Sequence, residues 1–202
     1  SLLTLIRKLI PLLAFFFFTL PTLACADEIT DLEGLVAHLE ANKEGSIELS
    51  TLTSLTRISS NPDKPGEART VSSFSGNLNG SGIEVVVLGG PLFNQISGAN
   101  IENLKITGEI INSAVANVGA LSGTSTNSTI SNVSANNVVI SNSPSQAGTL
   151  IGNSENSTYQ GITVSTSEVS GGSEIGGVVG KSQGDSFENV LVEQTSIGSD
   201  AI

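Results

Sequence analysis

Two series of apolar motifs recur with constant spacing in the second half of the chain, and this periodicity limits the possible folds more than any other feature. The first series consists of glycine-flanked apolar blocks whose starts are 29 and 28 residues apart, at 118–123, 147–152 and 175–180. The second series advances in steps of 29, 29 and 28 residues, at 101–104, 130–133, 159–162 and 187–190. Because the two series keep the same phase, they define a structural repeat.

Each repeat offers about three short strands separated by turns of glycine, serine and asparagine, with no helical period. Such a unit fits one coil of a parallel β-helix, in which a strand pairs with its counterpart about 4.8 Å away in the next coil. We therefore predict an all-β fold, a right-handed parallel β-helix. Apolar residues at equivalent positions should stack inward as ladders, whereas Ser154 is expected in a turn. The predicted inward residues are Ile101, Leu104, Ile130, Val133, Tyr159, Ile162, Phe187 and Val190 on one wall, and Leu121, Leu150 and Val178 or Val179 on another.

Residues 1–26 have the features of a secretory signal peptide. Arg7 and Lys8 precede an apolar run of about a dozen residues, which is too short to span a membrane, and small residues follow at 24–26. Cys25 is the only cysteine, so the exported part has no disulfide framework. Two outcomes remain open for it: removal by cleavage after Ala26, which we prefer, or lipidation at a lipobox-like site. We expect a secreted or cell-surface protein, attached to a membrane only if Cys25 is lipidated.

Residues 27–70 are predicted to form an N-terminal lead-in or cap, followed by β-helix repeats over 71–202. An amphipathic helix is expected at 27–42, because Thr30 and Glu33 form a capping box and Leu32, Leu35, Val36 and Leu39 recur at helical spacing. A short strand is expected at 47–49, and a loop at 59–66. Since the sequence contains no methionine and ends directly after a strand-like run, we expect a fragment of a longer protein.

The charge balance argues against one class of partner. All 19 acidic residues lie at or after Asp27, whereas Arg7 and Lys8 leave only six basic residues there, which gives a net charge of −13. Such a surface repels phosphate backbones, so nucleic-acid binding is not expected. A host or envelope protein or a glycan is the expected kind of partner.

Asparagine recurs at one position of the repeat. Asn103, Asn132 and Asn189 share this position, and Gly161 replaces them in the intervening coil. A structural role is favoured, in which the asparagines hydrogen-bond turn backbone or form an interior amide ladder. Sugar or calcium binding is the functional alternative.

Two longer segments carry a family resemblance. The sequence FSGNLNGSGI at 74–83, followed by PLFNQISGANIENL at 91–104, resembles the opening of bacterial GLUG-type surface repeats. The later segments IGGVVG at 175–180 and FENV at 187–190 are similar to the repeats of that family. The same arrangement resembles the β-helical N-terminal region of immunoglobulin A-specific zinc metallopeptidases and related Zmp proteins, over residues 70–197. Asn77 and Asn79 depart from the threonine and aspartate that are usual there.

The chemistry of such a peptidase is missing from the sequence. It requires H-E-x-x-H, in which two histidines hold zinc and the glutamate activates water. His38 is the only histidine, and we expect it at the surface. The acidic residues after position 100 are mostly single, and the glycine-rich segment 171–177 lacks the partners of a phosphate or calcium loop. We therefore predict no catalytic, cofactor-binding or metal-binding residue.

The sequence thus predicts an exported surface module for adhesion, recognition or spacing, corresponding to the non-catalytic N-terminal part of a Zmp-like protein. One alternative class remains open: a fragment of an enzyme, either a secreted zinc peptidase without its catalytic domain or a glycan-active β-helix enzyme. The ligand is not marked by the sequence, because solenoid faces bind through scattered polar groups.

Overall fold

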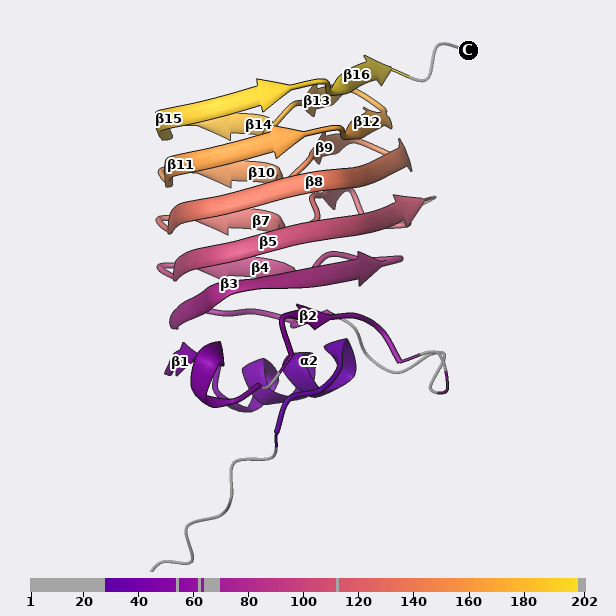
Figure 1. The fold of residues 1–202 in the computed structure, drawn as a ribbon. Helices are drawn as coiled ribbons and strands as arrows, with labels where there is room; N and C mark the ends of the chain where they lie inside the picture. Colours follow the sequence, from indigo (N-terminus) through magenta and orange to yellow (C-terminus); the bar gives the residue numbers. More distant parts are fainter. Residues whose placement is uncertain (1–27, 54, 62, 64–69, 112, 200–202) are drawn as a thin grey trace, which may run out of the picture.

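The computed structural model describes residues 28–53, 55–61, 63, 70–111 and 113–199. Within them a short N-terminal segment precedes a stack of β-coils (Figure 1). The N-terminal segment contains helix α2 (Leu32–Ala41), strand β1 (Ser46–Glu48), a 3-10 turn (Leu49–Thr51) and strand β2 (Arg57–Ile58). Strands β1 and β2 both pair with the first long strand of the stack, so this segment is joined to the solenoid.

The coils contribute strands to three parallel sheets. The first and largest sheet contains β1 and β2, followed by β3 (Asn77–Leu88), β5 (Asn100–Ile111), β8 (Thr129–Ser143), β11 (Thr158–Ser165), β12 (Glu168–Gly171), β15 (Ser186–Glu193) and β16 (Ser196–Ser199). The second contains β4 (Phe93–Ser97), β7 (Ser122–Thr126), β10 (Ile151–Glu155) and β14 (Val179–Gln183). The third contains β6 (Asn117–Val118), β9 (Gln146–Gly148) and β13 (Glu174–Gly176).

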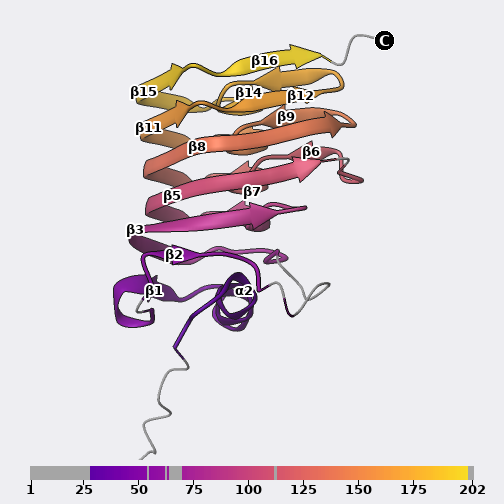
Figure 2. The same ribbon diagram turned by 45° about the vertical axis from the view of Figure 1, so that its right-hand side comes forward.

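The coil is right-handed. In Figure 1 the strands of the first sheet run to the right at the front, those of the second run to the left behind them, and the chain rises from coil to coil. The turned view in Figure 2 shows the same stacking. The predicted right-handed parallel β-helix is confirmed.

The register of the strands matches the repeat seen in the sequence. Ile101 pairs with Ile130, Ile130 with Tyr159, and Tyr159 with Phe187. Leu78 of β3 continues this ladder one coil earlier, beside Ile101, and Ile47 of β1 pairs with Leu78. Since Leu78, Ile101, Ile130 and Tyr159 are fully buried, the ladder forms one wall of the core.

A second wall is formed by Leu121 and Leu150, both fully buried, and by Val178, which is 8% exposed. Val178 rather than Val179 stands in their row, because Val179 pairs with Ile151. At the neighbouring glycine block, a Cβ on Gly148 would lie 2.6 Å from the Gly180 nitrogen of the next coil. Glycine at this position therefore permits the close approach of successive backbones.

The coils turn at residues with left-handed φ. Nine non-glycine residues in the described chain adopt this conformation, and eight of them, all except Ser81, lie in three vertical rows. The rows are Gly98, Asn127, Asn156 and Gly184; Asn103, Asn132, Gly161 and Asn189; and Gly108, Asn137, Thr166 and Gln194. Asparagine and glycine tolerate this region best, which explains why they exchange at one repeat position.

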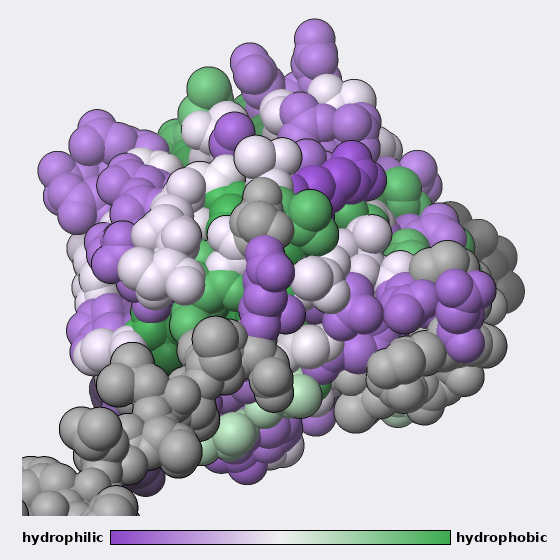
Figure 3. All heavy atoms as spheres, turned by 60° about the horizontal axis from the view of Figure 1, so that its bottom comes forward, coloured by the Kyte–Doolittle hydropathy of each residue, from purple (hydrophilic) through white to green (hydrophobic). Residues whose placement is uncertain are grey.

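Helix α2 covers the N-terminal end of the solenoid (Figure 1). Leu32, Leu35, Val36 and Leu39 are buried in the common core, as predicted. The predicted capping box is wrong. Asp31 is the N-cap, and its Oδ1 accepts from the Gly34 backbone N–H at 2.8 Å, while Glu33 accepts from the Asn61 N–H at 2.9 Å. Seen from this end, hydrophilic residues separate the hydrophobic ones on the surface (Figure 3).

The inward side chains of the last described coil are partly exposed to solvent. Phe187 is 46% exposed, whereas Tyr159, its counterpart one coil earlier, is fully buried. The two rings still stack, with centroids 4.9 Å apart. Phe187 therefore keeps the predicted inward direction without being buried.

Candidate functional site: an amide-lined groove

The asparagine row lies on the outer surface of the first sheet. Asn132 and Asn189 are exposed and Asn103 is half-buried. The expectation of an interior amide ladder is therefore wrong. The reason is geometric: the residue with left-handed φ interrupts the alternation of the strand, and the apolar residues that follow it, Leu104 and Val133, take the inward position.

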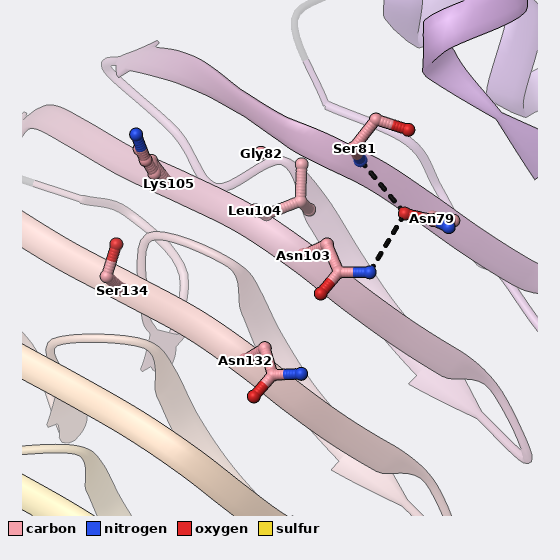
Figure 4. A pocket seen from close by; sticks show the side chains of 8 residues that line it. All are labelled: Asn79, Ser81, Gly82, Asn103, Leu104, Lys105, Asn132 and Ser134. Atoms are coloured by element: carbon pink, nitrogen blue, oxygen red, sulfur yellow. Dashed lines mark hydrogen bonds between the residues drawn. The ribbon is translucent and has the colours of Figure 1, made fainter.

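A shallow groove runs across β3, β5 and β8 at this row (Figure 4). It is lined by Asn79, Ser81, Gly82, Asn103, Leu104, Lys105, Asn132 and Ser134. Asn79 Oδ1 accepts two hydrogen bonds, from the Ser81 backbone N–H at 2.9 Å and from Asn103 Nδ2 at 3.1 Å. Figure 4 shows the Asn79, Asn103 and Asn132 side chains following one another on neighbouring strands.

Two further hollows extend the groove along the same face. One shares Asn79 and adds Asn77, Asn100, Ser46, Glu48 and Glu102 from the coil edge next to β1. The other shares Lys105 and Ser134 and adds Glu84, Thr107, Asn136 and Asn137. Asn100 Nδ2 donates to Asn77 Oδ1 at 2.7 Å, so amide pairs also line the first extension. Amides and hydroxyls make up most of the lining side chains, alongside the apolar residues Ile47, Leu78, Leu104 and Ile106.

A second polar cluster lies inside the solenoid, and sequence reasoning missed it. Ser154 was predicted in a turn, but it belongs to β10 and is 1% exposed. Its Oγ lies 2.6 Å from the Tyr159 hydroxyl and donates to Asp185 Oδ1 at 3.0 Å. Ser157 N–H donates to the same carboxylate oxygen at 2.7 Å. A signal was present in the sequence, since serine recurs at 125, 154 and 182 in the repeat phase.

Burial raises the pKa of Tyr159 to about 12. The phenol therefore stays protonated at neutral pH and acts as a hydrogen-bond partner of Ser154. Ser125, Ser154 and Ser157 are almost completely buried, whereas Asp185 is half-buried. The hydrogen bonds of the cluster therefore satisfy polar groups inside the solenoid.

Two carboxyl groups elsewhere in the described chain, on Glu40 and Glu174, have lowered pKa values. Lys43 and the Ser72 backbone N–H hydrogen-bond Glu40 and hold the pKa of that carboxyl below its usual value. Gln146, with Lys181 nearby, does the same for Glu174. Within residues 28–199, leaving aside the undescribed gaps, no group of three or more His, Cys, Asp or Glu side chains is placed to hold a metal ion.

His38 lies half-buried in the last turn of α2, and its carbonyl oxygen accepts from Asn42 Nδ2 at 2.8 Å. Arg7, Lys8 and Cys25, with the predicted signal peptide, lie outside the described residues. Helix α2, which has ten residues, is not a membrane span, and no other helix of the described chain is long and apolar enough to be one.

Stacked parallel coils with a helical cap and a polar outer face define a repeat protein of the β-solenoid class. The family model for the M26 IgA1-specific metallo-endopeptidase N-terminal region matches residues 14–137, which is more than half of the sequence. The chain therefore belongs to this family, as a β-helical, non-catalytic N-terminal region. Proteins of the M26 family are secreted or surface bacterial proteases. No curated protein and no solved structure matches the chain significantly.

Proposed function

We propose that this chain is a recognition and spacing module on the cell surface or in the surrounding medium, which binds through the outer face of its first sheet. The observation that supports this function most directly is the groove across β3, β5 and β8, where unpaired amide and hydroxyl groups are displayed on a regular scaffold. Binding residues held on a rigid scaffold lose little conformational entropy when a ligand is bound.

The scaffold suits the spacing part of the proposal. Successive coils are joined by continuous parallel ladders, and the apolar ladders inside them are buried. A solenoid of this kind lengthens in one direction with each repeat and contacts only its neighbours. It can therefore hold a binding face away from the point where the protein is attached.

Adhesion tests the recognition role. Beads that carry the full chain are compared with beads that carry an unrelated protein of similar negative charge, on epithelial cells and on bacterial envelope preparations. We expect adhesion above the control on at least one of these surfaces. Equal adhesion of the two kinds of bead on every surface would contradict the recognition role.

Hydrolysis assays test the non-catalytic part. The chain is incubated with protein and acidic-glycan substrates, with zinc or calcium added, and we expect no turnover. Metal-dependent turnover that disappears on His38→Ala or on removal of a single glutamate would favour the enzyme class instead.

Export is measured separately. We propose cleavage after Ala26, which gives a soluble product that begins at Asp27. Intact-mass measurement of the exported protein checks this, because a diacylglyceryl adduct on Cys25 would show lipidation and attachment to a membrane.

A further inference from the structure

We infer that the amide-lined groove binds an uncharged, extended polysaccharide that runs along the solenoid axis, with successive sugars on successive coils. This inference rests on the recognition role proposed above and adds the class of ligand. It is carried by three properties of the groove: the hydrogen-bonding groups that are left free, their repeat along the solenoid axis, and the charge around them.

The hydrogen-bonding groups that are free in the groove are complementary to the hydroxyl groups of a sugar. An asparagine side chain offers two N–H donors and one carbonyl acceptor, and a sugar hydroxyl both donates and accepts. Asn103 Nδ2 is engaged by Asn79, but Asn103 Oδ1 makes no hydrogen bond within the described chain. The Asn132 amide and the Ser134 hydroxyl make none there either, so their donors and acceptors are available to a ligand.

The backbone does not require these amides. Gly161 occupies the same repeat position with φ 63°, beside Asn103 at 58° and Asn132 at 51°. Glycine therefore satisfies the same corner without a side chain. The amides of Asn103 and Asn132 are additional groups, displayed on two neighbouring coils of the same face.

Their spacing suits a polymer. Equivalent residues on paired strands repeat about every 4.8 Å along the axis of the solenoid. An extended β-linked polysaccharide advances by a similar distance with each sugar, so consecutive sugars can meet Asn79, Asn103 and Asn132 in turn. The two hollows at Asn77 and Asn100 and at Asn136 and Asn137 lie beside this track, displaced along the strands, and widen the polar face around it.

The charge around the groove favours an uncharged polysaccharide over an acidic one. Glu48 and Glu102 line one extension and Glu84 lines the other, where Glu84 pairs with Arg57 at 3.2 Å. Lys105 is the one basic residue that lines the groove and its two extensions. Because the sequence as a whole carries a net charge of −11, an acidic polysaccharide would be repelled.

The test uses the full chain and the neutral hexasaccharide chitohexaose, with cellohexaose as a second neutral probe and hexagalacturonate as the acidic one. Binding is measured by calorimetry and by the NMR shifts of asparagine side-chain amides. We expect a dissociation constant of about 0.1 to 1 mM for a neutral hexasaccharide, since an open groove buries only part of its ligand. Hexagalacturonate should bind more weakly.

The decisive variant is the double substitution Asn103→Gly and Asn132→Gly, which keeps left-handed backbone at both corners. Its affinity for the neutral hexasaccharide should fall about tenfold or more, as expected from the loss of two or more hydrogen bonds. The matched control is Asn127→Gly, an exposed asparagine with φ 50° in another corner row, and it should bind like the parent. Circular dichroism of all variants checks that the fold is kept.

Unchanged affinity of the double variant, equal loss in the Asn127→Gly control, or no binding of either neutral hexasaccharide at about 10 mM would each overturn the inference. Adhesion of chain-coated beads separates this result from the recognition role. If adhesion persists while the hexasaccharides fail to bind, only the glycan inference is lost; if both fail, the recognition role is lost as well.

Discussion

At the scale of single residues, Tyr159 shows how a polar group is accommodated in a solenoid core. It is the only tyrosine of the chain, it is fully buried, and its ring stacks on Phe187 of the next coil. The hydroxyl reaches Ser154, which also bonds to Asp185. One side chain thus continues an apolar ladder and, at its tip, joins a hydrogen-bonded cluster that links two coils.

The raised pKa of Tyr159 predicts alkaline destabilisation. The folded protein holds this proton up to a pKa of about 12, whereas the unfolded chain releases it near its usual value of about 10. The stability contributed by the neutral phenol is therefore complete below pH 10 and is lost as the pH rises from about 10 to about 12. The free energy of unfolding should fall by about 2 to 3 kcal/mol in that window because of this group.

The absorbance of tyrosinate measures this titration directly, because the chain has one tyrosine and no tryptophan. Tyr159→Phe should remove the absorbance change and reduce the alkaline loss of stability. A folded-state titration near the pKa of free tyrosine would contradict the buried position.

At the scale of elements, helix α2 and strand β10 each differ in one respect from what the sequence predicted. The apolar face of α2 was correctly predicted, but the cap lies at Asp31 because its carboxylate reaches the Gly34 N–H, while Glu33 turns to the Asn61 backbone. Leu150, directly before β10, and Ser154, within it, are both buried, although only Leu150 is apolar. Capping and burial here depend on partners that lie outside the element itself.

The helix cap can be tested by comparing two neighbouring substitutions. Asp31→Ala should lower the free energy of unfolding by about 1 kcal/mol, because the Gly34 N–H loses its acceptor. Thr30→Ala should change it by less than about 0.5 kcal/mol, since Thr30 is exposed and outside the cap. Urea unfolding measures both values. A larger effect at Thr30 than at Asp31 would restore the capping box that the sequence suggested.

Strand β10 and the residue directly before it, Leu150, allow a similar comparison. Leu150→Ala should cost about 2 to 5 kcal/mol, as expected for a large buried side chain replaced by alanine. Ser154→Ala should cost about 1 to 3 kcal/mol, because it leaves the buried Tyr159 hydroxyl without its partner. Gln160→Ala, at an exposed site of β11, is the control and should stay within about 0.5 kcal/mol. Thermal unfolding that ranks Ser154→Ala with the control would contradict the interior hydrogen bond.

At the scale of the whole molecule, stability depends on coils that stack in register. Thr129 pairs with Thr158, Ile101 with Ile130, and Ile130 with Tyr159, so residues 130–158 correspond to one complete coil. The ends of the stack are unlike each other. Helix α2 covers the first coil, whereas Phe187, Val192 and Ile197 in the last described coil are 40 to 46% exposed.

Deletion of residues 130–158 should therefore leave a shorter folded solenoid, because Thr129 then joins Tyr159 in the register that Thr158 had. Deletion of residues 130–143 removes only part of a coil, so it places inward residues outside and should unfold the repeats. Circular dichroism during urea unfolding compares the two. The one-coil interpretation fails if the partial deletion is the better folded of the two proteins.

The sequence by itself determined the repeat, and with it the fold class, the inward ladders and the positions of the corners. This was possible because each coil interacts mainly with identical positions in its neighbours, so that spacing along the chain becomes stacking in space. The tertiary structure alone decided which face each non-apolar residue takes. Asn103 and Asn132 lie outside because a left-handed residue breaks the alternation of the strand, and Ser154 lies inside because Tyr159 and Asp185 provide its partners. Such choices depend on the backbone conformation of single residues and on individual hydrogen-bond partners, which a repeat pattern does not specify.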